Sequence, residues 1–179
     1  MCIRDSAQLG KAIDRIWQQS MSGYYLLDAT REVIQGFKKR EAARPVIVAL
    51  TTDGPELSFT GYQGVLESIV DSKTSFNVIS LGKPSAATDD FSIARNTVVD
   101  NGTARSGGTH ERLLTSMAVG PKLKQVASVL THEYLVTYAH PDTLLPPEKI
   151  TVSVHRANLV ARGRPVKIAQ STQGPQTRP

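Results

Sequence analysis

The feature that most constrains the fold is an apolar run of strand length that stops at a tight polar turn. Residues 45–50 read Pro-Val-Ile-Val-Ala-Leu, and Thr51, Thr52, Asp53 and Gly54 follow them. A short, continuous apolar run between turn signals is typical of a strand that is buried on both faces of a sheet. We therefore expect Asp53 at the carboxyl end of such a strand, which is where open α/β sheets bind ligands.

Helical and strand patterns alternate on both sides of this run. Apolar residues recur at helical spacing over 7–19, 26–39 and 62–71, and again over 91–99 and 121–130. A second strand is predicted at 75–81, and Asn101 with Gly102 is expected to end the helix over 91–99. Short links between helix and strand imply parallel strands with right-handed crossovers. The expected fold class is an open, mainly parallel α/β sheet flanked by helices, of Rossmann-like type.

The pattern changes after residue 131. Residues 133–138 and 149–155 alternate strictly between apolar and polar side chains across a Pro-rich connection. This alternation predicts a C-terminal antiparallel β hairpin, with a possible short third strand at 159–162. Residues 167–179 are rich in Gln, Thr, Pro and Gly without periodicity, which is typical of a disordered tail. The expected divisions are an α/β domain over 7–131, a hairpin extension over 132–166 and the tail.

Composition narrows the possible partners. The formal net charge of +5 comes from scattered Lys and Arg and from small clusters that do not alternate with aromatic residues. A single-strand nucleic-acid surface would show that alternation, so we expect no nucleic-acid partner. The apolar runs are much shorter than the roughly 18 residues of a membrane span, so none is expected. Cys2 is the one cysteine of the chain, which excludes an internal disulfide and a cysteine metal cage.

Signals for catalysis are weak. Residues 102–109 have glycines spaced as in a phosphate-binding loop, but Gly108 replaces the lysine, so we expect a flexible turn before a strand. His110 and His132 each precede a glutamate, yet neither has a second histidine four residues further on, as a zinc-protease helix requires. No serine stands in a Gly-x-Ser-x-Gly elbow. We therefore predict no catalytic residues and no enzymatic activity.

The first six residues, Met-Cys-Ile-Arg-Asp-Ser, look like the translation of a sequencing-library adapter fused to a reading frame that was already running. On this interpretation they are a non-native start and the natural protein begins upstream. A signal peptide would then not be visible here.

Several segments occur in the order seen in one bacterial family. Gly23 followed by Leu-Leu-Asp-Ala at 26–29 resembles a Gly-Thr-x-Leu-Tyr-Asp-Ala helix start, residues 46–54 resemble a metal-loop strand, and 106–108 resemble a Thr-Gly-Gly turn. Residues 133–138 look like a Gln-Tyr-x-Leu-x-Tyr strand, and 150–162 like a closing hairpin that ends in Val-Arg-Ala-Arg. This order, over about residues 7–165, resembles the von Willebrand factor A-related acidobacterial domain, a branch of the von Willebrand factor type A (vWA) domains.

The departures from that family bear on metal binding. Its Asp-x-Ser-x-Ser motif, which supplies most of the metal shell, does not occur in this sequence, and its place would be upstream of Ala7. Tyr24 stands where the family has a metal-binding threonine, so Asp53 alone remains of the metal-dependent adhesion site. One carboxylate does not hold Mg²⁺ or Ca²⁺, which take about six to eight oxygen ligands. No cofactor is expected in this chain, although Mg²⁺ or Ca²⁺ is possible in a longer parent protein. Truncation and a metal-free scaffold both remain open as explanations.

The resemblance implies a protein-recognition module in an extracytoplasmic or secreted setting, with an unknown protein ligand. Thr51, Thr52 and Gly54 mark its expected ligand edge beside Asp53. The simpler interpretation of Asp53 is a turn residue, because Asp-Gly is a common turn pair. The alternative function is an α/β enzyme domain that binds a nucleotide or small ligand at the same switch point. A third possibility is a purely structural part that docks onto a neighbouring domain.

Overall fold

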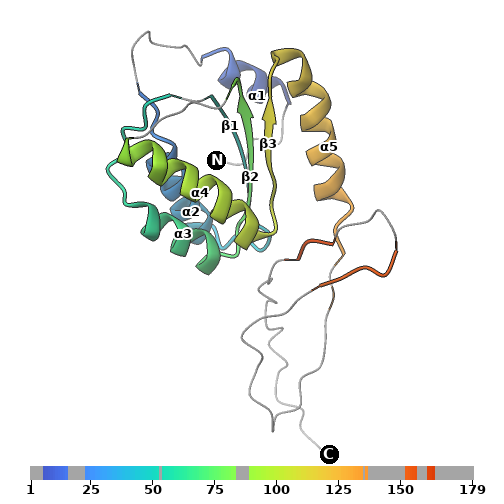
Figure 1. Cartoon of the computed structure of the whole chain (residues 1–179). Helices are drawn as coiled ribbons and strands as arrows, with labels where there is room; N and C mark the ends of the chain where they lie inside the picture. The colour runs from blue at the N-terminus through green and yellow to red at the C-terminus, as the bar shows by residue number, and fades with distance from the viewer. Residues whose placement is uncertain are drawn as a thin grey trace, which may run out of the picture.

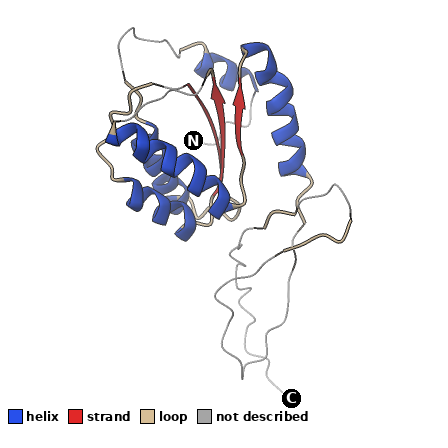
Figure 2. Ribbon diagram, viewed as in Figure 1, coloured by secondary structure: helices blue, strands red, loops and turns tan. Residues whose placement is uncertain are grey.

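The computed structural model describes residues 6–15, 23–52, 54–83, 89–134, 136, 152–156 and 161–163. In chain order the elements are α1 (Ser6–Ile13), α2 (Leu26–Lys39), β1 (Val46–Thr52), α3 (Tyr62–Asp71), β2 (Ser75–Leu81), α4 (Asp90–Ser106), β3 (His110–Leu113), the 3₁₀ helix η1 (Ser116–Ala118) and α5 (Val119–Thr131). Figure 2 shows this mixture of helices and strands. The predicted α/β class is confirmed.

The three strands form one parallel sheet in the order β1, β2, β3. Val46 lies opposite Ser75, and Val78 lies opposite His110. The crossovers are α3 and α4, which group with α2 on one side of the sheet, whereas α5 lies on the other side beside β3 (Figure 1). This arrangement is compatible with a Rossmann-like fold, and it places the carboxyl ends of all three strands at one edge.

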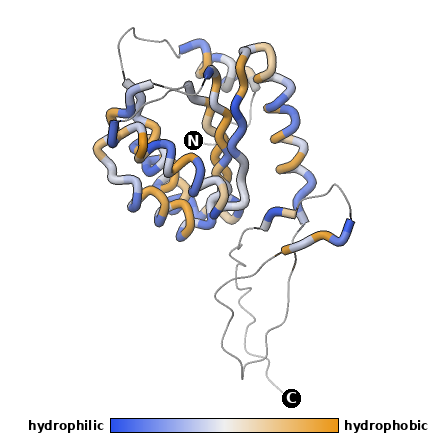
Figure 3. The backbone as a smooth tube through the Cα atoms, in the orientation of Figure 1, coloured by the Kyte–Doolittle hydropathy of each residue, from blue (hydrophilic) through white to orange (hydrophobic). Residues whose placement is uncertain are grey.

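The core lies between β2 and the helices α2, α3 and α4. Phe76 and Val78 point from β2 to this side and pack in one cluster with buried residues of the three helices, which include Ile34, Ile69 and Val98. Figure 3 shows hydrophobic stretches along the strands and alternating hydrophobic and hydrophilic stretches along the helices. Burying each side chain of this size contributes about 1.5–3 kcal/mol relative to leaving it exposed.

Three predicted spans agree with the structure residue for residue. They are 26–39 for α2, 62–71 for α3 and 75–81 for β2. Two helices differ at their ends. α1 ends at Ile13, and residues 14 and 15 form a turn; residues 16–22 lie outside the described part. α5 begins at Val119, before the predicted Pro121.

The helix α4 corrects the predicted stop at Asn101 and Gly102, because it continues to Ser106. A Cβ on Gly102 would lie 3.1 Å from Ile69 and 3.2 Å from Phe76, so the missing side chain lets α4 pack closely on α3 and β2. The helix ends instead at Gly107, whose φ of 72° suits glycine. The flexible turn predicted over 103–108 is thus mostly helix, and the strand expected after it is β3.

The prediction that the apolar run of β1 is buried on both faces is wrong. Ile47 and Ala49 pack against the core, but Val48 and Leu50, which point to the other face, are exposed, Leu50 by 57%. In Figure 1, α5 lies beside β3, the strand at the opposite end of the sheet order from β1. The strand that is buried throughout is β2, where Ile79 on the second face is also buried.

The predicted hairpin is not shown. Of its residues, 133, 134, 136, 152–156 and 161–163 are described, and none of these lies in a strand. The other residues of the predicted hairpin, residues 1–5 of the predicted non-native start and the predicted tail lie outside the described residues, so these divisions stay predictions. In the part of the chain that the structure describes, no helix combines the length and apolar character needed to cross a membrane.

Candidate functional site

The predicted ligand edge lies at the carboxyl end of β1. Thr51 and Thr52 are the last residues of the strand and are half-buried, as is Gly54. The Thr51 hydroxyl donates to the Thr52 carbonyl oxygen at 3.1 Å. Asp53 lies outside the described residues, so its role as a metal ligand stays a prediction.

Tyr24 lies against this edge. Its phenol oxygen hydrogen-bonds the hydroxyl of Thr52. Its ring fills the space beside Gly54, where a Cβ would come within 2.0 Å of ring carbon Cε2. Any larger residue at position 54 would therefore displace the tyrosine. The structure brings Tyr24 together with two of the three predicted edge residues, Thr52 and Gly54.

The chain before α2 is paired with the loop after β1. The backbone N–H of Tyr24 donates to the Pro55 carbonyl at 2.8 Å, and that of Leu57 donates to the Tyr24 carbonyl at 2.7 Å. The carboxylate of Glu56 is buried between them and accepts from the Leu26 N–H at 3.4 Å and from the hydroxyl and N–H of Ser58. Because a buried carboxylate is costly unless it is hydrogen-bonded, these contacts fix the loop in one position.

Asp28 holds the next part of that loop. Its two carboxylate oxygens accept from the backbone N–H groups of Phe59 at 3.0 Å and Thr60 at 2.9 Å. Its own N–H donates to the Ser58 hydroxyl at 3.1 Å. Hydrogen bonding by the Thr60 side chain, then by these N–H groups and the charge of Arg31, outweighs burial and lowers the pKa of Asp28 below 3.8. The carboxylate is therefore charged at neutral pH.

Arg95 reaches the same edge from α4 and is only 3% exposed. Its Nη1 donates to the Gly54 carbonyl oxygen at 2.8 Å, and its Nε and Nη2 donate to the Asn96 side-chain oxygen at 3.4 and 3.2 Å. A guanidinium stays charged at physiological pH. It repels a second unit positive charge about 6 Å away by roughly 3 kcal/mol at an effective dielectric constant of about 20.

The described donors at this edge do not fit a divalent cation. The described residues Thr51, Thr52 and Gly54 supply no carboxylate, and Arg95 adds a positive charge, which disfavours a cation. Within the described ranges, no group of three or more His, Cys, Asp or Glu side chains is placed to hold a metal ion. The described residues of this edge offer a ligand hydrogen bonding and apolar contact.

A hollow of about 450 Å³ lies beside the edge, on the helical side of the sheet. It is formed by the starts of α2 and α4 and by the loop between β1 and α3. The exposed large apolar side chains that line it are those of Phe59, Tyr62, Phe91 and Ile93, and the buried Leu27 also contributes to the lining. We call it the aromatic hollow. Exposed apolar side chains gathered at one place are typical of an interaction site.

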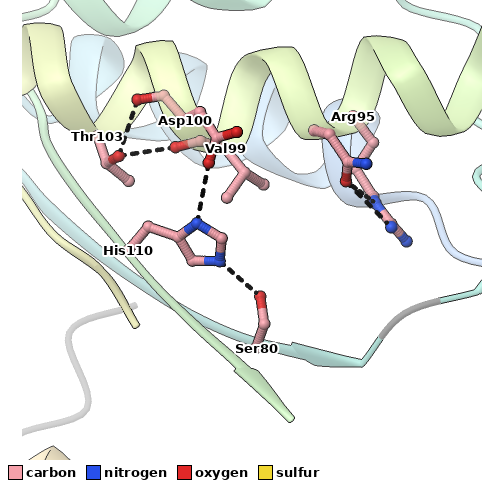
Figure 4. A network of polar contacts seen from close by, with 7 residues as sticks. Ser80, Arg95, Val99, Asp100, Thr103 and His110 are labelled. Carbon is pink, nitrogen blue, oxygen red and sulfur yellow. Dashed lines mark hydrogen bonds and ion pairs between the residues drawn. The ribbon is translucent and has the colours of Figure 1, made fainter. Parts of the chain in front are cut away.

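A second polar network joins β2, β3 and α4 (Figure 4). The Ser80 hydroxyl lies 3.0 Å from Nε2 of His110, and Nδ1 of His110 lies 3.0 Å from the Asp100 carboxylate. This is the connectivity of a serine, histidine and aspartate triad. However, Ser80 is 3% exposed, and the Asp100 side chain is 68% exposed. A catalytic triad needs a hydroxyl that the substrate can reach and a carboxylate that is sheltered from solvent. This network has neither, so we interpret it as a structural link between two strands and a helix.

Sequence reasoning missed the contacts of Tyr24, Arg95 and Ser80, because each joins segments that are 28 or more residues apart. The signal for Tyr24 was its place in the family pattern. Phe59 and Phe91 carried a signal that was not used, since each aromatic stands in a polar stretch next to a predicted helix start. His110, which the sequence does not place in a zinc-protease motif, is partly buried and hydrogen-bonded.

A comparison of the sequence with models of protein families and with curated proteins finds no match in either.

Proposed function

We propose that this chain is a protein-recognition module of von Willebrand A type that binds its partner without a resident metal ion. The surface that takes part is the carboxyl edge of β1 together with the aromatic hollow. The observation that carries the proposal is the occupation of the edge by this chain's own side chains: Tyr24 bonds Thr52 and packs on Gly54, and Arg95 holds the Gly54 carbonyl. The extracytoplasmic setting and the C-terminal hairpin belong to the same proposal and rest on the family resemblance.

The test is selection of a displayed random peptide library on the immobilised chain in EDTA. The proposal predicts enrichment of related peptides that bind saturably in EDTA and no more tightly when Mg²⁺ or Ca²⁺ is added. No enrichment over a blank surface would contradict recognition of peptides. Binding that requires Mg²⁺ would contradict the metal-free mode.

The network of Ser80, His110 and Asp100 favours the alternative, an α/β enzyme domain. In such an enzyme the histidine would remove the serine proton as the hydroxyl attacks a substrate carbonyl. The near-complete burial of Ser80 weighs against this function. Covalent labelling of Ser80 by a fluorophosphonate probe would favour the enzyme domain over the recognition module.

A further inference from the structure

The aromatic hollow presents several large apolar side chains to solvent. Phe59 is 94% exposed and Phe91 is 60% exposed, with Ile93 and Tyr62 beside them. Aromatic side chains are among the residues that contribute most to binding when a partner buries them. A partner that covered these residues would remove from water the apolar area that the fold leaves uncovered.

Both phenylalanines stand on rigid backbone. The N–H of Phe59 is held by Asp28 at 3.0 Å, and the next N–H, of Thr60, by the same carboxylate at 2.9 Å. Phe91 lies in the first turn of α4, whose N-cap Asp89 accepts from the Ser92 N–H at 2.9 Å. Anchors on an ordered backbone lose little conformational freedom on binding, which favours affinity.

The chain as a whole is positive, but Asp90 is the charged residue among the described residues that line the hollow, and none of these is a lysine or arginine. Asp89 precedes Asp90 in the chain and caps α4. The backbone N–H of Ser92 lowers the pKa of Asp89, so this carboxylate is charged at neutral pH. Two carboxylates outweigh the half charge at the start of α4. The chain has a net charge of +5, so the acidic rim of the hollow differs in sign from the chain as a whole. An acidic rim favours a partner with basic groups.

We propose that the aromatic hollow binds a peptide segment of a partner protein in which an apolar side chain neighbours a lysine or arginine. The apolar side chain enters the hollow between Phe59 and Phe91, and the basic group lies against Asp89 and Asp90. This inference rests on the proposed function, because it names the class of partner for that recognition surface.

The experiment uses peptides enriched on the full chain in the selection above, each measured by fluorescence anisotropy against four variants. Phe91→Ser and Asp90→Asn alter the hollow. Met117→Ser and Asp71→Asn are matched controls, since Met117 is exposed on η1 and Asp71 is exposed at the end of α3. All four positions are exposed, so the fold should survive, and circular dichroism checks this.

The inference predicts that the enriched peptides pair lysine or arginine with large apolar residues. Their affinity should fall at least tenfold in Phe91→Ser and several-fold in Asp90→Asn, and stay within twofold of wild type in both controls. Enriched peptides that are acidic, or that bind all four variants equally, would overturn the hollow as the site and leave the proposed function standing. An absence of enriched peptides would overturn the proposed function, and this inference with it.

Discussion

The strands β1 and β2 pair along their full length, yet their surroundings differ. All but the last residue of β2 is buried, and its side chains contact helices on one face and are covered on the other. In β1, Ile47 and Ala49 reach the core while Val48 and Leu50 are exposed. Apolar burial therefore holds β2 in place. The carboxyl end of β1 has polar contacts as well, because Tyr24 hydrogen-bonds Thr52 and Arg95 donates to the Gly54 carbonyl just beyond the strand.

This difference separates the part of the molecule that supports the fold from the part that is open to a partner. A strand that is buried on both faces has no surface left for recognition. A strand with one face exposed, and with hydrogen-bonding side chains at its end, keeps that surface available. The exposed face of β1, with Val48 and Leu50, lies opposite the core, whereas the candidate site lies at the end of the strand and in the hollow on the helical side.

The largest difference in stability is expected between truncating a buried apolar side chain of β2 and truncating an exposed one of β1. Phe76→Ala should lower the free energy of unfolding by about 3–5 kcal/mol, because Phe76 is fully buried and leaves a cavity. Leu50→Ala should cost less than about 1 kcal/mol, because Leu50 is already exposed. Urea denaturation of both variants measures the contrast. Equal losses would show that β1 is buried as deeply as β2.

A smaller effect is expected at the loop that follows β1. Asp28→Asn should cost about 1–2 kcal/mol at neutral pH, since it weakens charged hydrogen bonds to two backbone N–H groups. The pKa of Asp28 is lowered in the folded state, so its contribution is present above 3.8 and is lost as the pH falls through the lowered value. Denaturation from pH 7 to pH 2 should show the two proteins converging at the acid end. Asp71→Asn is the control, with less than about 0.5 kcal/mol expected; a pH-independent difference for Asp28→Asn would contradict this role.

Much of the fold could be predicted because α2, α3 and β2 have clear periodicity, and their spans matched. The end of α4 could not be predicted, because Asn101 and Gly102 have the local pattern of a helix stop. The helix continues to Ser106, and Gly102 packs closely on Phe76 and Ile69. The exposure of Leu50 depends on which helix covers the second face of the sheet. No local pattern contains that information.

The ligand edge of Thr51, Thr52 and Gly54 was expected from the family resemblance, and its role stays a prediction. Thr51 and Thr52 are the last residues of β1, as the apolar run before them indicates. The contacts of Arg95 with Gly54 and of Asp28 with the loop depend on tertiary structure, because the paired segments are distant in the sequence.

A charge on the exposed face of β1 should change association more than folding. Leu50→Lys should alter the free energy of unfolding by no more than about 0.5 kcal/mol, as for other exposed positions. It should raise the concentration at which the chain aggregates, because exposed apolar residues on an edge strand promote association. Light scattering against concentration gives the measurement, with Val33→Lys on the exposed side of α2 as the control. If wild type stays monomeric and unfolds reversibly at high concentration, this view of β1 is wrong.

The smallest effect is expected at Ser80, near the end of β2. A fluorophosphonate probe should not label the folded chain, because the buried hydroxyl cannot reach the probe. Mass spectrometry of the intact protein decides, with a purified serine protease as the positive control. Labelling in wild type that disappears in Ser80→Ala would favour the enzyme over the recognition module.

The most direct test of metal-free recognition is calorimetric titration of the purified chain with Mg²⁺, Ca²⁺ and Mn²⁺, alongside the Asp53→Ala variant. Tyr24 and Arg95 occupy the edge, so both proteins should give only the heat of dilution with all three ions. A saturable heat in wild type that Asp53→Ala abolishes would mean that Asp53 anchors a working metal site, and would contradict recognition without metal.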